Sequence, residues 1–142
     1  MAITIKIKKL KEDAKVPSYA HPGDAAMDIF ASETVELKPG EQAAISTGVA
    51  MEIPFGCVGL VWDKSGLAIN NGLKTLGGVI DAGYRGEIKI GMINLSKNPY
   101  TLEKGNKVAQ IIIQKREEAA LEEVVELSDT ARGEGGFGST GK

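Results

Sequence analysis

The sequence predicts an all-β fold, arranged as a sandwich or a barrel. Short runs of apolar and β-branched residues recur along most of the chain, and glycine, asparagine or proline separates them. This pattern is typical of many short strands joined by turns. With 142 residues, 42% of them hydrophobic and 25% charged, the chain has the size and composition of one domain. No internal repeat is found, and the composition changes only after Ser128, where polar residues and glycines take over.

The expected strands follow one another along the chain. The N-terminal run MAITIKIKKL alternates between apolar and polar residues, as a half-buried strand does. Pro39 and Gly40 predict a turn between two short strands in the range 35–46. Further strands are expected in VAMEIP, CVGLVW, EIKIGMINLS and KVAQIIIQK. The segment 116–127, REEAALEEVVEL, is instead rich in helix formers, so local propensity predicts a helix there.

Composition and charge argue against several classes of function. The net charge is −2 and no long basic run is present, so nothing predicts binding to nucleic acid. The longest apolar stretches, such as VAQIII, are too short to span a bilayer, and the N-terminal run lacks the apolar block of a signal peptide. Cys57 is the single cysteine, which suits a reducing compartment. We therefore expect a soluble, cytoplasmic protein that binds neither nucleic acid nor membranes.

Three segments between the expected strands carry side chains suited to phosphate chemistry. In GGVIDAGYRGEI, Asp81 follows an apolar run. A carboxylate at a strand end can accept a proton from an attacking water, although such a residue is more often a turn aspartate. In DKSGLA, Lys64, Ser65 and the amide of Gly66 offer an anion site, and Ser65 would serve equally well as a helix N-cap. In GDAAMDIFA, Asp28 is a further carboxylate, which a polar loop alone would also explain.

The last eleven residues, RGEGGFGSTGK, include five glycines. This composition is typical of a disordered end. The match to a phosphate loop is only formal, because such a loop needs a helix after its lysine, and here Lys142 stands last. Glycines nevertheless let backbone amides approach an anion. The guanidinium of Arg132 can bind phosphate through two hydrogen bonds, and the hydroxyls of Ser139 and Thr140 are further donors. Phe137 suits stacking on a base. The segment is thus either a disordered end or a nucleotide-binding loop.

Taken together and in this order, five segments resemble the motifs of the trimeric dUTPase family (deoxyuridine triphosphate nucleotidohydrolases): PGDAAMDIFA, DKSGLA, GGVIDAGYRGEI, GNKVAQIIIQ and RGEGGFGSTG. The resemblance covers essentially the whole chain. It implies a jelly-roll β subunit in a homotrimer that hydrolyses dUTP to dUMP and pyrophosphate with Mg²⁺. It also implies a β domain over 1–131, a mobile lid over 132–142, and a segment 117–128 that leads into a terminal strand instead of forming a helix.

The family pattern implies a role for each matching residue. Asp81 matches the carboxylate that orients and deprotonates the water attacking the α-phosphorus, and Tyr84 the ring that packs under the deoxyribose and excludes a 2′-hydroxyl. A hairpin from Thr75 to Lys89 would bind the polar edge of uracil through its backbone. Asp28 would hold the metal through a water, Mg²⁺ itself being chelated mainly by the triphosphate. The remaining matches are Val79, Ile80 and Lys89 at the base, Lys64, Ser65, Gly66, Gln110, Arg132, Ser139 and Thr140 at the phosphates, and Phe137 stacked on uracil.

The chain departs from the family pattern at several positions: Met27 replaces a usual aromatic, Lys107 stands where arginine is common, and two further departures concern the expected site. Asp63-Lys64 stands where Pro-Arg is usual, and Thr75 stands where asparagine is common. Lys64 keeps the positive charge of arginine but lacks its bidentate fork. Two alternatives come from other classes: a dCTP deaminase-like enzyme of the same fold, and a nucleotide-binding trimer without catalysis. The intact IDAGYRG and RGEGGFGSTG argue against the first, and the presence of Asp81 argues against the second.

Overall fold

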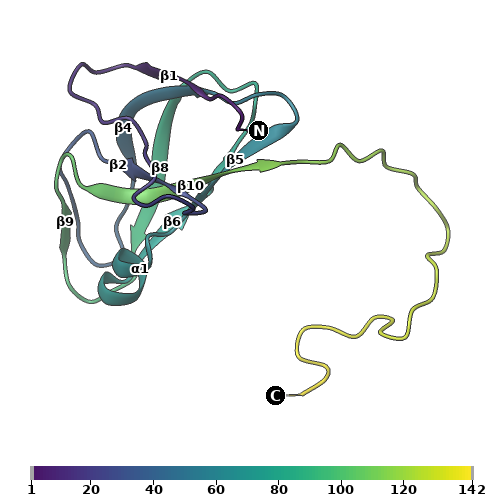
Figure 1. Ribbon diagram of the computed structural model, residues 1–142. Coiled ribbons are helices and arrows are strands. Elements are labelled where there is room, and N and C mark those ends of the chain that lie inside the picture. The colour runs from purple at the N-terminus through teal and green to yellow at the C-terminus, as the bar shows by residue number, and fades with distance from the viewer. Residues whose placement is uncertain (1, 142) are drawn as a thin grey trace.

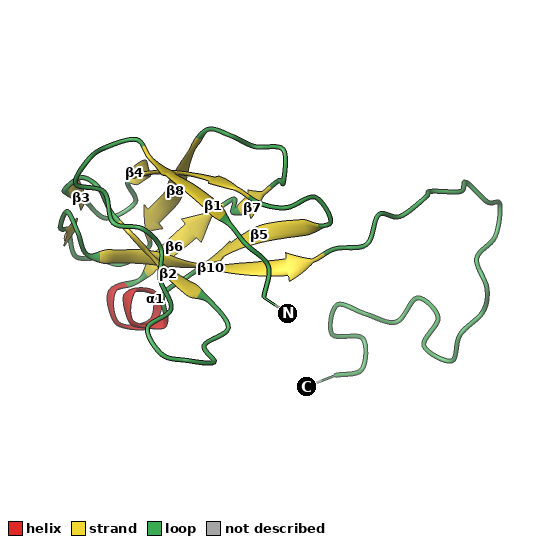
Figure 2. Ribbon diagram, turned by 45° about the horizontal axis from the view of Figure 1, so that its top comes forward, coloured by secondary structure: helices red, strands yellow, loops and turns green. Residues whose placement is uncertain are grey.

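Two four-stranded antiparallel sheets, packed face to face, make up most of the molecule in the computed structural model, which describes residues 2–141 (Figures 1 and 2). The first sheet has the order β1 (Lys6–Lys9), β4 (Gln42–Glu52), β8 (Glu87–Asn94), β6 (Leu73–Leu76). The second has the order β2 (Met27–Phe30), β10 (Lys107–Lys115), β5 (Cys57–Trp62), β7 (Val79–Ile80). A two-stranded ribbon, β3 (Val35–Leu37) with β9 (Tyr100–Leu102), and one helix, α1 (Ser65–Asn71), complete the secondary structure of the described residues.

This arrangement confirms the all-β prediction and selects the sandwich over the barrel. Most neighbouring strands within a sheet are distant in sequence, as in β1 beside β4 and β2 beside β10, which is the connectivity of a jelly roll. Each sheet keeps two open edges, so neither closes on itself. The N-terminal strand forms over Lys6–Lys9 only, so Ile3 and Ile5 of the expected run lie outside it. The turn at Pro39-Gly40 lies between β3 and β4 as expected, and the Gly40 amide donates to the Asn94 carbonyl at 2.8 Å.

The core lies between the two sheets and follows from the alternation that the sequence shows. In β8, Ile88, Ile90 and Met92 are buried, while the residues between them face outward. They belong to the same apolar cluster as Ile29 of β2 and Ile111 of β10 from the opposite sheet. Complete burial of one such side chain contributes about 1.5–3 kcal/mol. The core therefore holds in place the strand ends from which the site residues project.

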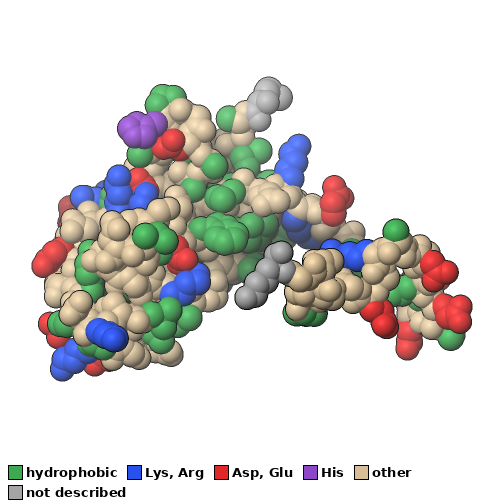
Figure 3. Space-filling view, turned by 90° about the horizontal axis from the view of Figure 1, so that it is seen from below, with side chains coloured by type: hydrophobic (Ala, Val, Ile, Leu, Met, Phe, Trp, Pro, Cys, Tyr) green, Lys and Arg blue, Asp and Glu red, His purple; other side chains and the backbone are tan. Residues whose placement is uncertain are grey.

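The segment after β10 differs from the helix that propensity predicts. Among the described residues, 116–131 form neither helix nor strand, and the chain curves away from the sandwich (Figure 1). Figure 3 shows acidic side chains gathered along this tail, and the side chains of Leu121, Val125 and Leu127 are at least 87% exposed. The helix prediction was wrong because this segment has no packing surface within its own chain, and helix propensity alone seldom suffices in water. A strand likewise needs an edge to pair with, so the terminal strand stays a prediction about an assembly of chains.

No helix among residues 2–141 is long and apolar enough to cross a bilayer.

Candidate functional site

A pocket of about 210 Å³ lies beside the connection between β6 and β8. The two strands are antiparallel neighbours, with Leu76 opposite Gly91, and residues 77–86 join them. Within this connection β7 pairs with β5 of the other sheet, Ile80 standing opposite Gly59. The connection thus bridges both sheets. The pocket brings together five of the predicted site residues and one further residue: Val79, Ile80, Asp81, Tyr84, Glu87 and Lys89.

Hydrogen bonds hold the turn that follows β7. The Tyr84 amide donates to the Asp81 carbonyl at 3.1 Å, and the Tyr84 hydroxyl donates to the Glu87 carbonyl at 2.8 Å. The Arg85 guanidinium donates to the Ala82 carbonyl at 2.6 Å. Asp81 itself is exposed and directly follows β7. An exposed carboxylate is accessible to a water molecule and to a bound ligand. The geometry therefore presents Asp81 and Tyr84 to the same pocket.

Glu87 lines this pocket, and sequence reasoning did not single it out. Its carboxylate accepts hydrogen bonds from the Ser46 hydroxyl and, at 2.9 Å, from the Gly48 amide, where the register of β4 against β8 shifts. Burial alone would raise the pKa of Glu87, but these hydrogen bonds outweigh it and lower the pKa. The sequence does show that a glutamate directly precedes the alternating apolar residues of β8. It does not show that this glutamate accepts hydrogen bonds from residues of β4.

A second group of predicted residues meets near the opposite edge of the second sheet, at β2 and β10. Asp28 of β2 stands directly opposite Gln110 of β10. Nζ of Lys64 lies 2.6 Å from Oδ1 of Asp28, and Nε2 of Gln110 donates to the Asp63 carbonyl at 2.8 Å. The helix α1 begins at Ser65, so its N-cap is Lys64 and the alternative of Ser65 as the cap is wrong. Asp28, Lys64, Ser65, Gly66 and Gln110 are therefore neighbours around the start of α1.

Asp28 is only 4% exposed, yet its charge is well compensated. Lys64 holds one carboxylate oxygen and Lys107, at 3.0 Å, holds the other. Burial alone would raise the pKa of Asp28, but the hydrogen bonds from the two ammonium groups outweigh it, so the pKa is lowered. Among residues 2–141 no three His, Cys, Asp or Glu side chains cluster as a metal cage would require. A single carboxylate fits contact with a metal through water, with the inner ligands supplied by phosphates.

The two groups are far apart within one chain. Along β10, Gln110 is paired with Asp28, and Ile113 is paired with Gly59, which in turn pairs with Ile80. Measured along the strand direction of β10, the position paired through to Ile80 is therefore three residues, or about 10 Å, from the position paired with Asp28. Because β10 and β5 lie between β2 and β7, three strand spacings add about 14 Å sideways. Ile80 and Asp28 are thus on the order of 17 Å apart within one chain.

The glycine-rich tail lies apart from both groups. Arg132 uses its Nε to donate to the Gly135 carbonyl at 2.6 Å, so it folds back on the tail itself. Phe137 is completely exposed and has a φ of 51°, in the left-handed region. Ser139 and Thr140 are also exposed. The structure therefore places Arg132, Phe137, Ser139 and Thr140 on one segment but not over the pocket of their own chain.

Thr75 lies outside the pocket that Asp81 shares with Tyr84. It is buried in β6 and lines a smaller pocket of about 190 Å³, which also includes Val79 and Trp62. The two pockets thus share Val79 of β7.

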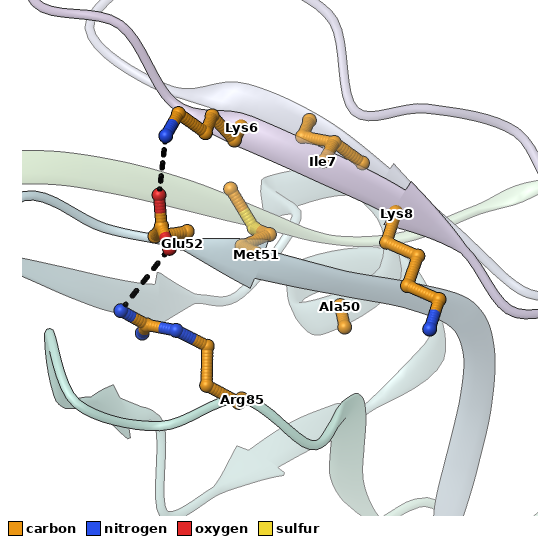
Figure 4. Close-up of a pocket in the computed structure, with 7 residues that line it drawn as sticks. All are labelled: Lys6, Ile7, Lys8, Ala50, Met51, Glu52 and Arg85. Carbon is orange, nitrogen blue, oxygen red and sulfur yellow. Dashed lines mark ion pairs between the residues drawn. The ribbon is translucent and has the colours of Figure 1, made fainter.

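Another pocket, of about 360 Å³, lies on the first sheet, between β1, the end of β4 and Arg85 (Figure 4). Figure 4 shows the Glu52 carboxylate between two cations, with Lys6 at 3.1 Å and Arg85 at 3.4 Å. None of the predicted site residues lines it. This pocket is linked to the site only indirectly, because the Arg85 guanidinium also donates a hydrogen bond to the Tyr84 carbonyl in the turn after β7.

Comparison with known proteins identifies the family to which this jelly-roll sandwich belongs. Residues 12–141 match the dUTPase family. The chain is 50% identical to the deoxyuridine 5'-triphosphate nucleotidohydrolase of Clostridium tetani, over 98% of this chain and 97% of that protein. It is 47% identical to the protein of the same name from Thermobifida fusca, over 98% of this chain and 79% of that protein.

Solved structures agree with the sequence comparison. The dUTPase of Staphylococcus bacteriophage 80alpha, solved with dUPNHPP, superposes with a TM-score of 0.93 at 36% identity, over 99% of this chain and 100% of that one. A mutant dUTPase from phage phi11 of S. aureus, in which a structural Mg(II) ion is coordinated, gives a TM-score of 0.82 at 33% identity, over 87% and 98% of the two chains. The chain belongs to the dUTPase family. It is an enzyme, a dUTP diphosphatase that hydrolyses dUTP.

Proposed function

We propose that Asp81 is the general base of this hydrolysis. A water attacks the α-phosphorus of dUTP and gives its proton to the Asp81 carboxylate. The bond from the α-phosphorus to the oxygen bridging to the β-phosphate breaks, so dUMP and pyrophosphate are the products. The observation that carries this proposal is the shared pocket of Asp81 and Tyr84, because it puts a base beside an aromatic surface for the sugar. Removing dUTP in this way limits uracil incorporation into DNA and supplies dUMP.

The same pocket supports selection of the nucleoside. At about 210 Å³ it is smaller than typical ligand sites, which suits one pyrimidine nucleoside with its phosphates outside. The ring of Tyr84 packs against the deoxyribose and leaves no room for a 2′-hydroxyl. Backbone groups near Val79 and Ile80 bind the polar edge of uracil, with Thr75 and Lys89 at the ends of the hairpin. Thymine is excluded by its methyl group, and cytosine by mismatched donors and acceptors.

The second group binds the triphosphate. Lys64, Ser65, the amide of Gly66 and Gln110 surround the start of α1, and they offer a cation and several donors to phosphate oxygens. Asp28 would hold Mg²⁺ through a water, and the bound ion would supply positive charge that neutralises part of the triphosphate. The ammonium groups of Lys64 and Lys107 at Asp28 keep the carboxylate charged and fixed in position for that contact.

The separation of Ile80 from Asp28, on the order of 17 Å within one chain, supports a site completed by a second copy of the chain. We propose a homotrimer in which Asp81 and Tyr84 of one subunit face the Asp28 group of the next. The exposed apolar residues of the segment 116–127 support its pairing with a neighbouring subunit. The lid over 132–142 then closes on a pocket of another subunit, where Arg132, Ser139 and Thr140 bind the γ-phosphate and Phe137 stacks on uracil. The buried free thiol of Cys57 supports a cytoplasmic enzyme.

One assay tests the proposal against its alternatives. The protein is incubated separately with dUTP, dCTP, dTTP and UTP in the presence of Mg²⁺, and pyrophosphate and ammonia are measured. We expect pyrophosphate from dUTP alone, and loss of that product when the metal is removed with a chelator. Ammonia released from dCTP would favour the deaminase-like alternative. Nucleotide binding without either product would favour a non-catalytic trimer.

A further inference from the structure

Gly86 provides the surface on which the ring of Tyr84 rests. A Cβ placed on Gly86 would lie 2.5 Å from Oη, 2.7 Å from Cζ and 3.0 Å from Cε1 of Tyr84. Carbon atoms without a bond between them do not approach so closely, so the ring occupies the space that any side chain at position 86 would need. The aromatic ring is therefore in van der Waals contact with the backbone two residues further along the chain.

A second contact fixes the far end of the same ring. The Tyr84 hydroxyl donates to the Glu87 carbonyl at 2.8 Å. The side chain of Glu87 is in turn bound to β4 through the Ser46 hydroxyl and the Gly48 amide. The hydroxyl thus fixes the ring to the first sheet. Tyr84 is 45% exposed, and it lines the pocket.

The glycine at position 86 is required by this contact and not by its backbone angles. Gly86 is not among the glycines with positive φ, unlike Gly77 and Gly78 of the same connection. An L-amino acid could therefore adopt its backbone conformation, and only the Tyr84 ring would be displaced by the new side chain. Displacing the Tyr84 ring costs little folding energy because the ring is already half-exposed. A substitution at Gly86 should therefore change the geometry of the site and leave the free energy of unfolding nearly the same.

We propose that Gly86 is a specificity-determining residue, which positions the Tyr84 ring and through it sets the discrimination between deoxyribonucleotides and ribonucleotides. This inference rests on the proposed role of Tyr84 against the sugar. A ribonucleotide differs there by one oxygen atom, so its exclusion by shape depends on a ring held within a fraction of an ångström. Gly86 does not contact the substrate and acts only through the ring.

The test compares Gly86→Ala with Gly83→Ala. Gly83 lies in the same turn, but a Cβ there meets nothing within 4 Å, which makes it a matched control. For each variant kcat/KM is measured with dUTP and with UTP, and the melting temperature is recorded. We expect Gly86→Ala to lower the ratio of dUTP to UTP activity by about tenfold or more while Gly83→Ala keeps it. An unchanged ratio in Gly86→Ala, with a lowered ratio in Tyr84→Ala, would overturn the inference and leave the proposed function standing.

A double variant shows whether Gly86 acts through the ring. In a Tyr84→Ala background, Gly86→Ala should produce no further change in the ratio, because the displaced group is gone. A further change of the same size as in the wild type would overturn the inference. If Gly86→Ala does not fold, the inference is also overturned, because displacement of the half-exposed Tyr84 ring costs little folding energy. If Tyr84→Ala itself keeps the wild-type ratio, the proposed role of Tyr84 fails, and the inference with it.

Discussion

Oδ1 of Asp63 accepts two hydrogen bonds from Thr75, one from its amide at 2.7 Å and one from its hydroxyl at 2.6 Å. Both residues stand at positions that depart from the family pattern, so these two departures are partners of each other. Lys74 adds an ion pair to the other carboxylate oxygen at 2.7 Å. The pair ties the segment before α1 to β6, and it directs the Thr75 hydroxyl toward Asp63.

Replacing Asp63 should reduce stability. In Asp63→Ala the buried amide and hydroxyl of Thr75 lose their acceptor, which is expected to lower the free energy of unfolding by about 1–3 kcal/mol. Lys74→Ala is the control, since it removes only a half-exposed ion pair and should cost no more than about 1 kcal/mol. Chemical denaturation of both variants measures the difference. Equal losses would show that the hydrogen bonds to Thr75 contribute nothing beyond the ion pair.

The contribution of Asp63 should depend on pH. Burial would raise its pKa, but the hydrogen bonds from Lys74 and Thr75 outweigh burial and lower the pKa. A carboxyl whose pKa is lower in the folded state than its unfolded value of about 3.9 stabilises the fold above that pH and loses this effect as the pH falls. The difference in unfolding free energy between wild type and Asp63→Asn should therefore be constant near neutral pH and shrink below about pH 4. A difference that grows on acidification would contradict the sign.

Asp81→Asn should abolish turnover and leave dUTP binding intact. Asparagine keeps the shape of the side chain but cannot accept the proton of the water, a loss of about 10²–10⁴-fold in kcat. Single-turnover kinetics with dUTP and equilibrium binding of a dUTP analogue separate the two effects. Comparable turnover in wild type and variant would remove Asp81 from the role of general base.

Deleting residues 132–142 should leave the fold nearly unchanged and sharply lower activity. The described part of this segment packs little apolar surface on the sandwich, so the melting temperature should shift little. The lost lid no longer excludes water or binds the γ-phosphate. A parallel fall in melting temperature and activity would instead point to a structural role for the tail.

Mixing two inactive variants tests whether sites are shared between subunits. The tail-deleted chain keeps Asp81, and full-length Asp81→Asn keeps the tail. Refolded together in equal amounts, they should regain activity at about a quarter of sites if the lid crosses between chains of a symmetric oligomer. Mixed oligomers that stay as inactive as their components would show that each subunit uses its own tail.

Local patterns in the sequence determined most of the strands, and they named the residues proposed for the site. The alternation around Ile88 and Ile90 has the period of a strand with one buried face, and Pro39-Gly40 has the geometry of a turn, so both could be predicted without knowing their partners. The motifs likewise named Asp81, Tyr84 and Asp28, because the residue types and their order are properties of the chain itself. The strand and turn predictions are confirmed because their physical cause is local, while the roles of the three site residues stay predictions.

Only the tertiary structure decided how far apart these residues lie and what holds them. The separation of Asp81 from Asp28 follows from the order of strands in a sheet, β2-β10-β5-β7, which neighbouring residues in the sequence do not encode. The contacts of Glu87 with β4 join positions about 40 residues apart in the chain. The segment 116–127 shows the converse case: its local propensity favours a helix, but a helix or a strand there needs a packing partner, and the single chain provides none among its described residues.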